Sequence, residues 1–401
     1  MRTLLLICQV YHPDTTSTSQ LFQLLVQRLV ERGWNVRVLC GFPTQNRHGH
    51  LPRNEFCNQV TIHRCGLRVP LKNNFFYRSL SYISFCTGVF FKLLFSPRQC
   101  VWLGLTNPPF NVHVMAMASL IRRHRFYYFI QDLHPEGLLA LNNWSQRNPI
   151  VRLWVFFNHI AYSKATTLFV LGRDMIPLLE RNYRLPLSRI AYLPHWSPVE
   201  PRYPIPFEDS QFFGEWELTG KFIIQYAGNM GLWHDISSLV QTAHAVQHEN
   251  DIQFVFIGDG IRKAAAMKLA AKLGVTNILW KDFLPLDDLE ESLAACHVSL
   301  ISLRQELEGI AVPCKLYGIL ATGRAVVAQV PADSEIALTV IENRCGVVVE
   351  PGNTHQLTRA LLHLKNNPDD VEAMGQRAFL AYQSKYTASS AADSLEQFLV
   401  Q

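Results

Sequence analysis

Short apolar runs alternate with amphipathic stretches along almost the whole chain, and this alternation limits the possible folds more than any other feature. Residues 3–10, TLLLICQV, predict a buried strand, and residues 35–43, NVRVLCGFP, predict another. Between them, the apolar residues of QLFQLLVQRLVERG, at 20–33, recur at intervals of three and four and predict a helix. Similar βαβ units continue through the first half, so we expect a parallel, doubly wound sheet there.

The alternation stops once and then restarts. Residues 197–219, SPVEPRYPIPFEDSQFFGEWELT, are rich in proline and acidic residues, and we interpret them as an interdomain linker. After this segment, strands are predicted again at KFIIQYAG, IQFVFIGDG and GVVVEPG, with helical stretches between them. The sequence therefore predicts an α/β fold with two Rossmann-like, doubly wound domains that face a cleft. We expect an N-terminal domain over 1–200, a C-terminal domain over 201–375, and a C-terminal helix over 376–401 that packs across the domain boundary.

Composition excludes several classes of protein. A length of 401 residues suits two domains of roughly 200 residues each. With 48% hydrophobic and 17% charged residues, the chain has ample core, which excludes a disordered protein. Nine cysteines, without a CxxC pair, favour reduced thiols in the cytosol over a disulfide framework or a structural zinc site. The net charge is +5, and the basic residues crowd the first half, which favours an anionic partner such as a membrane surface or a phosphorylated substrate.

The segment from Arg68 to Arg98 combines aromatic, aliphatic and basic residues. Its apolar run is interrupted by Lys92 and is too short and too broken to span a bilayer comfortably. A helix lying in the lipid headgroup layer would place the aromatic residues among the acyl chains and the basic residues on the phosphates. The alternative is a buried helix on one face of the sheet with a basic end. We expect a peripheral contact with the membrane through this segment.

Ligands of open α/β sheets bind beyond the carboxyl ends of the strands, so the loops at these ends are the candidate sites. In AGNMGLWHD, two glycines, Gly228 and Gly231, would let the backbone approach a ligand; a tight turn without a ligand is the alternative. The same alternative applies to the FIGDG turn at Gly258–Gly260. Neither half contains a convincing GxGxxG fingerprint, which argues against an NAD enzyme, and the lack of GxxxxGK[ST] excludes a P-loop enzyme.

One helix in the second half carries a lysine where a cation is normally disfavoured. In GIAVPCKLYGILATGRAVVA, at 309–328, Pro313 suits the start of a helix and Gly323 suits its end. Lys315 then lies in the first turn, close to the positive end of the helix dipole. Either it lies in solvent or an anion sits beside it, and Lys315 with the free N–H groups would hold a pyrophosphate. Glu308 could accept hydrogen bonds from sugar hydroxyls; Glu306 is an equal candidate on chemistry alone, and both could be plain surface carboxylates.

The order of these motifs resembles a known family. GNMG followed by Asp235, then IGDG, LPLDDLEESLAACHVSLISL, VPCKLYGILATGRAVVA and CGVVVEPGN resembles the retaining family 4 glycosyltransferases of GT-B architecture. In the first half, YHPDTTSTSQLFQLLVQRLVERGWNVRVLCGFP and FIQDLHPEG are similar to the branch that includes the fucosaminyl-type transferases of colanic-acid and O-antigen clusters. The resemblance covers essentially the whole chain.

The resemblance implies a nucleotide-sugar donor bound mainly by the second domain and an acceptor bound mainly by the first. It also implies no obligatory metal and no cofactor. The glutamate of the family's EGxxxP loop corresponds to Glu308, and the lysine of its PSK motif corresponds to Lys315, with Cys314 in place of the serine. A second family glutamate, which grips the ribose, is replaced by Gly318. His234 stands where relatives place a basic residue and is expected to take part of that role, at lower charge.

The predicted function is that of a retaining glycosyltransferase that uses a nucleoside-diphosphate sugar, with UDP favoured, in cell-surface polysaccharide synthesis. Its acceptor would be a glycan or a lipid-linked molecule, and its place the cytoplasm, at the inner face of the plasma membrane; no nucleic-acid partner is expected. The predicted catalytic residues are Glu308 and Lys315. The predicted donor-binding residues are Gly228, Asn229, Gly231, His234, Gly258, Asp259, Gly260, Glu308, Ile310, Ala311, Val312 and Lys315. The predicted acceptor-side residues are Thr16, Ser17, Thr18, Asp132, His134 and Glu136.

Two other functions remain open at this stage. A sugar-nucleotide epimerase of the same architecture would use similar phosphate loops. A non-catalytic scaffold subunit is the second alternative, because the ribose-binding glutamate of the family is missing.

Overall fold

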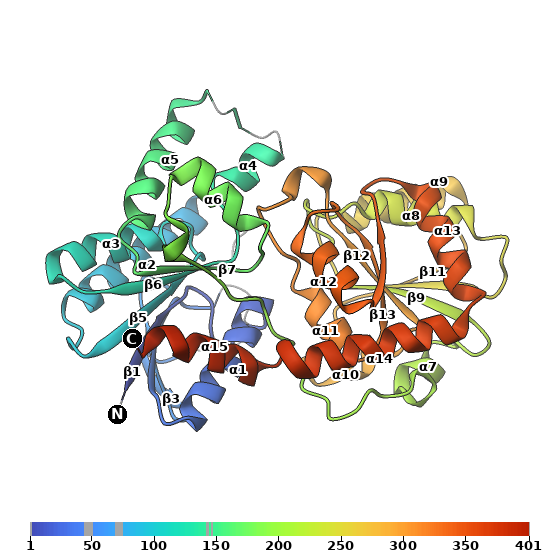
Figure 1. Cartoon of the computed structure of the whole chain (residues 1–401), viewed down its shortest axis with the longest axis horizontal. Coiled ribbons are helices and arrows are strands. Elements are labelled where there is room, and N and C mark those ends of the chain that lie inside the picture. The colour runs from blue at the N-terminus through green and yellow to red at the C-terminus, as the bar shows by residue number, and fades with distance from the viewer. Residues whose placement is uncertain (1, 44–50, 69–74, 142–143, 146, 401) are drawn as a thin grey trace. The chain divides into compact units, whose positions relative to one another are not determined.

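In a computed structural model, the chain folds into two compact units (Figure 1). The first unit consists of Met1–Pro194, Gly309–Ala311 and Ala388–Gln401, and the second consists of His195–Glu308 and Val312–Thr387. The structure describes residues 2–43, 51–68, 75–141, 144–145 and 147–400.

The first unit contains an eight-stranded sheet in the order β3-β4-β2-β1-β5-β6-β7-β8. All neighbouring strands are parallel except β3 and β4, which form an antiparallel hairpin at one edge. The predicted parallel sheet is confirmed, whereas the hairpin was not predicted. Its two-residue turn, Asn58-Gln59, has positive φ at both positions but contains no glycine, so the usual sequence signal is missing. The strands are β1 (Thr3–Ile7), β2 (Asn35–Cys40), β3 (Asn54–Cys57), β4 (Val60–Arg64), β5 (Cys100–Leu105), β6 (Phe126–Ile130), β7 (Thr167–Val170) and β8 (Ile190–Tyr192).

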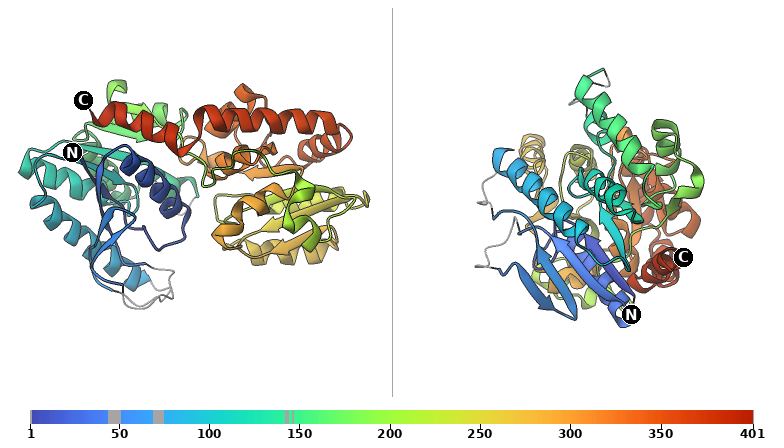
Figure 2. Two further views of the ribbon diagram at one scale, coloured as in Figure 1. Left: turned by 90° about the horizontal axis from the view of Figure 1, so that it is seen from below. Right: turned by 90° about the vertical axis from the view of Figure 1, so that its left-hand side faces the viewer.

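The helices of the first unit cover both faces of this sheet. Because crossovers between parallel strands are right-handed, α1, which leads from β1 to β2, lies on one face. The first connections lead from β1 toward β4, whereas those after β4 lead to β5 and onward, in the opposite direction along the sheet. Right-handed connections in that direction place α2, α3 and α5 on the other face. Helix α3 packs against both α2 and α5, and α1 packs against α15 (Figure 2). The helices are α1 (Ser17–Glu31), α2 (Phe75–Leu94), α3 (Asn111–Arg122), α4 (Glu136–Ala140), α5 (Pro149–Tyr162), α6 (Met175–Tyr183), the short η1 (Leu187–Arg189) and α15 (Ala388–Leu399).

The C-terminal segment forms two helices rather than the single helix expected over 376–401. Helix α14 (Pro368–Lys385) belongs to the second unit, and α15 belongs to the first. Several polar contacts attach α15 to the rest of the first unit. Arg32 Nη2 lies 2.8 Å from Asp393 Oδ1, Trp34 Nε1 donates to Glu396 Oε1 over 2.6 Å, and the Tyr127 hydroxyl donates to the Phe398 carbonyl over 2.9 Å. The last helix is therefore a structural part of the N-terminal sheet unit.

The second unit contains a six-stranded, wholly parallel sheet in the order β11-β10-β9-β12-β13-β14. This confirms the second Rossmann-like domain. The strands are β9 (Phe222–Ala227), β10 (Ile252–Ile257), β11 (Ile278–Lys281), β12 (Val298–Ser302), β13 (Ala325–Gln329) and β14 (Gly346–Val349). Its remaining helices are η2 (Phe207–Asp209), α7 (Gln211–Glu215), α8 (Ile236–Ala245), α9 (Lys263–Leu273), η3 (Leu286–Asp288), α10 (Leu289–Ala294), η4 (Gln305–Leu307), α11 (Lys315–Ala321), α12 (Glu335–Asn343) and α13 (Thr354–Lys365).

The strand order determines where each sheet can bind a ligand. In the second sheet, the chain runs from β9 outward through β10 and β11, then resumes at β12 on the other side of β9. The loops that follow β9 and β12 therefore diverge at the carboxyl edge and leave room for a ligand between them. In the first sheet, β1 and β5 flank the corresponding point. The candidate residues in the loops after the strands therefore lie at the carboxyl edges of the two sheets.

The segment interpreted as a linker is largely part of the second unit. Phe212, Trp216 and Leu218 are buried and pack with Ile223 and Ile257 in a hydrophobic cluster under the sheet. Ser210 caps α7 by accepting a hydrogen bond from the Phe212 N–H. A helix of five residues is too short to show a periodic pattern, which is why the proline-rich and acidic composition hid this packing.

In the part of the chain that the structure describes, no helix combines the length and the apolar character needed to cross a membrane. Of the segment from Arg68 to Arg98, residues 69–74 lie outside the described residues, and the rest is mainly α2.

We expect Leu395→Ala on α15 to lower the melting temperature of the protein, because Leu395 has 0% exposure and the substitution leaves a cavity against the first unit. Leu→Ala substitutions in cores cost about 2–5 kcal/mol, which corresponds to roughly 5–15 °C for a unit of this size. Leu380→Ala on α14, where the side chain is 62% exposed, is the matched control and should change the melting temperature by less than about 2 °C. Equal effects in differential scanning calorimetry would contradict the docking of α15.

Candidate functional site

Two glycines at the carboxyl edge of the second sheet allow close contacts that a larger residue would prevent. Gly228, directly after β9, has φ +121°, and a Cβ there would lie 2.8 Å from Lys315 Cε. Gly258, directly after β10, has φ +127°, and a Cβ there would lie 2.3 Å from the Gly228 carbonyl oxygen. The loops after β9 and β10 therefore stack on each other and on the Lys315 side chain.

The neighbouring residues of these loops stay close to one another. A Cβ on Gly260 would lie 2.6 Å from Asn229 Oδ1, and one on Gly231 would lie 3.0 Å from Asn229 Nδ2. Asp259 is exposed, and its carboxylate accepts from the Gly260 N–H over 2.7 Å. The structure thus brings together the predicted donor residues of both loops around Asn229.

Lys315 is a half-buried cation with neutral hydrogen-bond partners. Its ammonium group donates to the Tyr226 hydroxyl and, over 3.2 Å, to the Asn229 carbonyl, and it lies 3.8 Å from the centre of the Tyr226 ring. Among the described residues, no carboxylate lies within ion-pair distance of Nζ. Burial lowers the pKa of Lys315 to about 7. An anionic ligand would supply the negative charge that this site lacks.

The helix that carries Lys315 differs in one respect from the expectation. Helix α11 begins at Lys315 itself, after Cys314 as N-cap, so Pro313 precedes the helix instead of opening it. No side chain caps the helix, which leaves N–H groups of its first turn for another acceptor. Because the helix has seven residues, we assign the charge of the site to the ammonium group rather than to a helix dipole.

His234 does not provide a second positive charge. Its Nδ1 donates to the Ser302 carbonyl over 2.6 Å, and burial, followed by the charge of Lys315, lowers its pKa to about 3. The ring is therefore neutral near pH 7, so any part that His234 takes in the role of that basic residue does not use a full positive charge. Asp235 caps α8 by accepting from the Ser238 N–H over 3.2 Å.

Of the two candidate glutamates, the structure favours Glu308. Glu306 is exposed and pairs with Arg304 over 3.3 Å. Glu308 is half-buried, and its Oε2 accepts a hydrogen bond from Gln305 over 3.2 Å. Glu308 also ends the short helix η4 and stands directly before Gly309, where the chain turns toward α11.

The three residues after Glu308 pack with the first unit. The Gly309 N–H donates to Asp174 Oδ2 over 3.1 Å, and the Leu133 N–H donates to the Ile310 carbonyl over 3.0 Å. Ala311 pairs with Asp132 in an isolated antiparallel bridge. The structure thus places two predicted donor residues beside a predicted acceptor residue. Since the side chains of Ile310, Ala311 and Val312 are buried, a ligand contact there would use backbone groups.

At the carboxyl edge of the first sheet, the structure brings together the loop after β6 and the start of α1. Thr16 caps α1 by accepting from the Ser19 N–H over 3.4 Å, and Ser17 is exposed at the first helical position. Gln131 Nε2 donates to Thr18 Oγ1 over 3.4 Å. Burial raises the pKa of the neighbouring Asp132 to about 7, so this carboxyl group exchanges a proton near neutral pH.

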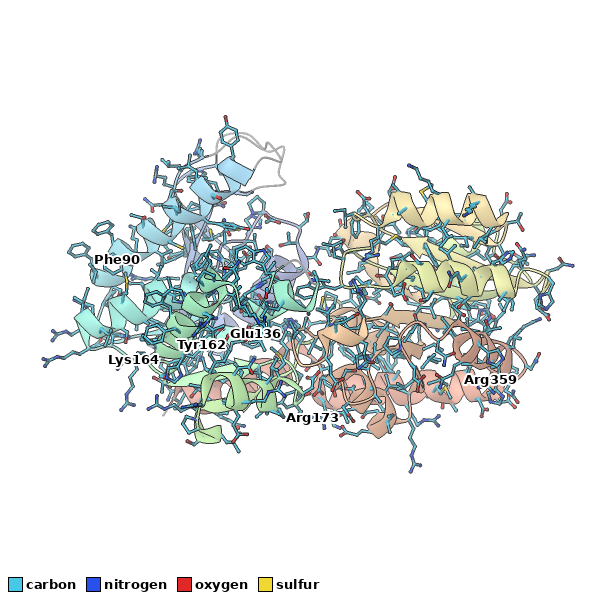
Figure 3. All side chains as sticks on the ribbon, turned by 90° about the horizontal axis from the view of Figure 1, so that it is seen from above. Phe90, Glu136, Tyr162, Lys164, Arg173 and Arg359 are labelled. Carbon is cyan, nitrogen blue, oxygen red and sulfur yellow. The ribbon has the colours of Figure 1, made fainter. Side chains whose placement is uncertain are left out.

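The other two predicted acceptor residues have structural surroundings. Glu136 is 7% exposed, and its carboxylate accepts from the Tyr183 hydroxyl over 2.7 Å and from Asn182 over 3.2 Å (Figure 3). These contacts connect α4 with α6, so the Glu136 carboxylate already accepts hydrogen bonds within the first unit. The His134 carbonyl accepts from Asn158 over 2.6 Å, and burial lowers the pKa of its imidazole to about 4.

One group of possible metal ligands occurs among the described residues, in the first unit. Ligand atoms of His12, Glu55 and Cys57 lie within 4.8 Å of one another. Glu55 is paired with Arg64 over 2.6 Å, and His12 Nδ1 lies 3.2 Å from Gln23 Oε1. The carboxylate of the group is thus already paired with a cation, and none of the three residues is a predicted site residue.

Sequence reasoning missed two residues of the second unit's site. Tyr226 contacts Lys315 with both its hydroxyl and its ring, and it stands two residues before Gly228, hence on the same side of β9. Phe283, which follows β11, is 59% exposed and lies 3.3 Å from the position of a Cβ on Gly258. The period of two along β9 could have indicated Tyr226, whereas no sequence signal distinguishes Phe283 from a core residue.

Comparison with known proteins agrees with this geometry. Residues 221–367 match the family "Glycosyl transferases group 1". The chain is 27% identical over 264 residues to "Probable glycosyltransferase WbjE" of Pseudomonas aeruginosa; this match covers 66% of each protein, just under two thirds of the relative's length. It is 24% identical over 384 residues to "Putative colanic acid biosynthesis glycosyl transferase WcaI" of Escherichia coli (strain K12), which covers 89% of this chain and 91% of that protein.

Comparison with solved structures identifies the fold. The Anabaena protein Alr3699/HepE, in complex with UDP-glucose, superposes with a TM-score of 0.73 at 13% identity and 100% coverage of both chains. Residues 221–367 form a Glycosyl transferases group 1 domain, and the two units have the GT-B fold. The family match covers β9 to α13 and therefore includes the second-unit residues of the candidate site.

We expect Lys315→Met to raise the melting temperature of the glycosyltransferase at about pH 6.5 by roughly 2–4 °C, because it removes an unpaired buried charge. The folded pKa of about 7 lies below the value of about 10.4 for an unfolded lysine. Between these values the unfolded state binds more protons than the folded state, so the stability of the natural protein rises with pH. The difference in melting temperature between Lys315→Met and the natural protein should therefore narrow toward about pH 9.5.

The matched control is Lys268→Met, on the exposed side of α9, which should behave like the natural protein at both pH values. If Lys315→Met melts no higher than the natural protein at the lower pH, or if the difference in melting temperature grows with pH, Lys315 is not a half-buried lysine with a lowered pKa.

Proposed function

We propose that the glycosyltransferase transfers a sugar from a UDP-sugar to a glycan or lipid-linked acceptor with retention of anomeric configuration, in cell-surface polysaccharide synthesis. The name of WcaI refers to colanic acid biosynthesis, and HepE was crystallised with UDP-glucose; both support this class of substrate. In this proposal the second unit binds the donor and the first unit binds the acceptor. No obligatory metal or cofactor takes part.

The observation that carries the proposal is the unpaired ammonium group of Lys315 beside Gly228. Breaking the bond between the anomeric carbon and the diphosphate leaves negative charge on the leaving group. Once the donor is bound, a protonated Lys315 next to that oxygen stabilises the charge as it develops, because the site does not have to reorganise during the reaction. Because residues 228 and 258 have no side chain, the backbone of both loops can come close to the same phosphates.

The nucleoside and the sugar would occupy the two sides of this phosphate site. On one side, the exposed Phe283 beside Gly258 offers an aromatic face on which a uracil ring can stack. On the other side, Glu308 can accept hydrogen bonds from hydroxyl groups of the donor sugar. The ribose has no partner at Gly318, where an added Cβ would meet Leu293 and Pro198.

In the proposed reaction, an acceptor hydroxyl attacks the anomeric carbon on the face that the diphosphate leaves. The new C–O bond forms, the bond to the diphosphate oxygen breaks, and the hydroxyl proton passes to the leaving group or to Asp132. The pKa of Asp132, about 7, suits proton uptake at neutral pH. Thr18 and Gln131 would bind other hydroxyl groups of the acceptor.

A lipid-linked acceptor would place the reaction at the inner face of the plasma membrane. We include in the proposal a peripheral membrane contact through the segment from Arg68 to Arg98, of which α2 is the described part.

We expect UDP and UDP-sugars to raise the melting temperature more than GDP or ADP compounds do, since a ligand bound only by the folded state stabilises it. Lys315→Met should abolish this shift, and Lys268→Met should keep it. An undiminished shift in Lys315→Met would remove Lys315 from the site and with it the main support for the proposal. The lack of any nucleotide shift in the natural protein would favour a scaffold subunit.

The reaction itself is tested by incubating a UDP-sugar with and without acceptor and following the anomeric proton by NMR. We expect a new glycoside with the configuration of the donor only when acceptor is present. Interconversion of the sugar without acceptor would favour an epimerase, and an inverted glycoside would exclude the retaining reaction.

A further inference from the structure

The outer side of α5 is apolar although it faces solvent. Ile150, Leu153, Phe157 and Ile160 are exposed and recur at intervals of three and four along the helix. Phe156 extends the same exposed surface. A helix of a soluble protein normally turns charged and polar residues outward, so this face has the character of one that is covered in use.

The neighbouring helices continue this surface. On α3, Met117, Leu120 and Ile121 are exposed, and on α2 and directly after it, Ile83, Phe91 and Phe95 are exposed. Helix α3 packs between α2 and α5 on the same face of the sheet. Arg122 Nη2 also donates to the Ser96 carbonyl over 2.7 Å, which ties α3 to the end of α2. We call this exposed apolar surface of α2, α3 and α5 the three-helix face.

Positive charges predominate on the three helices and on the segments that join them. Between residues 56 and 173 the sequence contains thirteen Lys and Arg residues but only two acidic residues, Asp132 and Glu136. Glu136 is buried against Tyr183, and Asp132 lies at the carboxyl edge of the sheet, so neither belongs to the three-helix face. Exposed basic residues accompany all three helices (Lys92, Arg98, Arg123, Arg125, Arg152 and Lys164). Figure 3 labels Lys164 beyond the end of α5 and Phe90 on α2.

We propose that the three-helix face docks on a bilayer that contains anionic phospholipids. Aromatic and aliphatic side chains in the acyl region with basic side chains at the phosphates are the chemistry of an interfacial membrane helix. A protein partner would have to match a broad apolar surface that is fringed mainly by positive charge, whereas an anionic bilayer complements both properties at once. The inference deepens the membrane contact of the proposed function: it moves the centre of that contact from α2 to α3 and α5. It requires neither sugar transfer nor nucleotide binding.

The test is sedimentation of the full chain with phosphatidylcholine vesicles, prepared with and without phosphatidylglycerol. We expect binding to the anionic vesicles, weakening as salt rises, and little binding to neutral ones. Leu153→Glu with Phe157→Glu should weaken binding about tenfold or more, because two charges enter the apolar contact. The matched control is Ile341→Glu with Leu380→Glu, two equally exposed apolar residues of the second unit, which should bind like the natural protein.

The melting temperature and its shift with UDP are measured on all variants, so that misfolding or a failed nucleotide proposal is seen separately from lost vesicle binding. Equal vesicle binding by the face variant and the control, or no binding by the natural protein, would overturn the inference. So would concentration-dependent self-association in analytical ultracentrifugation that only the face variant abolishes, since the three-helix face would then join two copies of the chain.

Discussion

The account depends on one electrostatic constraint: a positive charge is held in a partly buried site whose other groups are neutral. The Lys315 ammonium group contacts the hydroxyl and the ring of Tyr226 and the backbone carbonyl of Asn229, and burial lowers the pKa of Lys315 to about 7. Such a charge reduces the stability of the folded protein unless an anion lies beside it, and in the proposed function a bound diphosphate is that anion. Gly228 makes this arrangement possible, because a side chain there would displace the lysine.

Chain topology explains why this site lies where it does. Parallel strands send all their carboxyl ends to one edge, and the change of direction at β9 and β12 opens that edge between diverging loops. The same rule operates in the first unit, where Thr18, Gln131 and Asp132 meet at the carboxyl edge. Right-handed crossovers then place α2, α3 and α5 on one face of the first sheet, which gathers their exposed apolar residues into a single surface.

Much of the fold could be predicted from the sequence, and less of the site. The alternation of strands and helices was sufficient for both parallel sheets, and the glycine loops and Lys315 follow from residue type and position. The hairpin at Asn58, the buried Trp216 and the orientation of Glu136 depend on tertiary contacts that leave no periodic trace. The neutral state of His234 could not be predicted either, since its low pKa arises from burial beside Lys315.

The most direct test of the central claim is calorimetric titration of UDP at about pH 8 in two buffers with different ionisation enthalpies. At that pH a lysine with a pKa of about 7 is mostly neutral, and it must take up a proton when a diphosphate binds beside it. The account predicts a binding enthalpy that differs between the buffers as proton uptake requires, and no such difference in Lys315→Arg, whose guanidinium stays charged. Tight UDP binding with the same enthalpy in both buffers for the natural protein would contradict it.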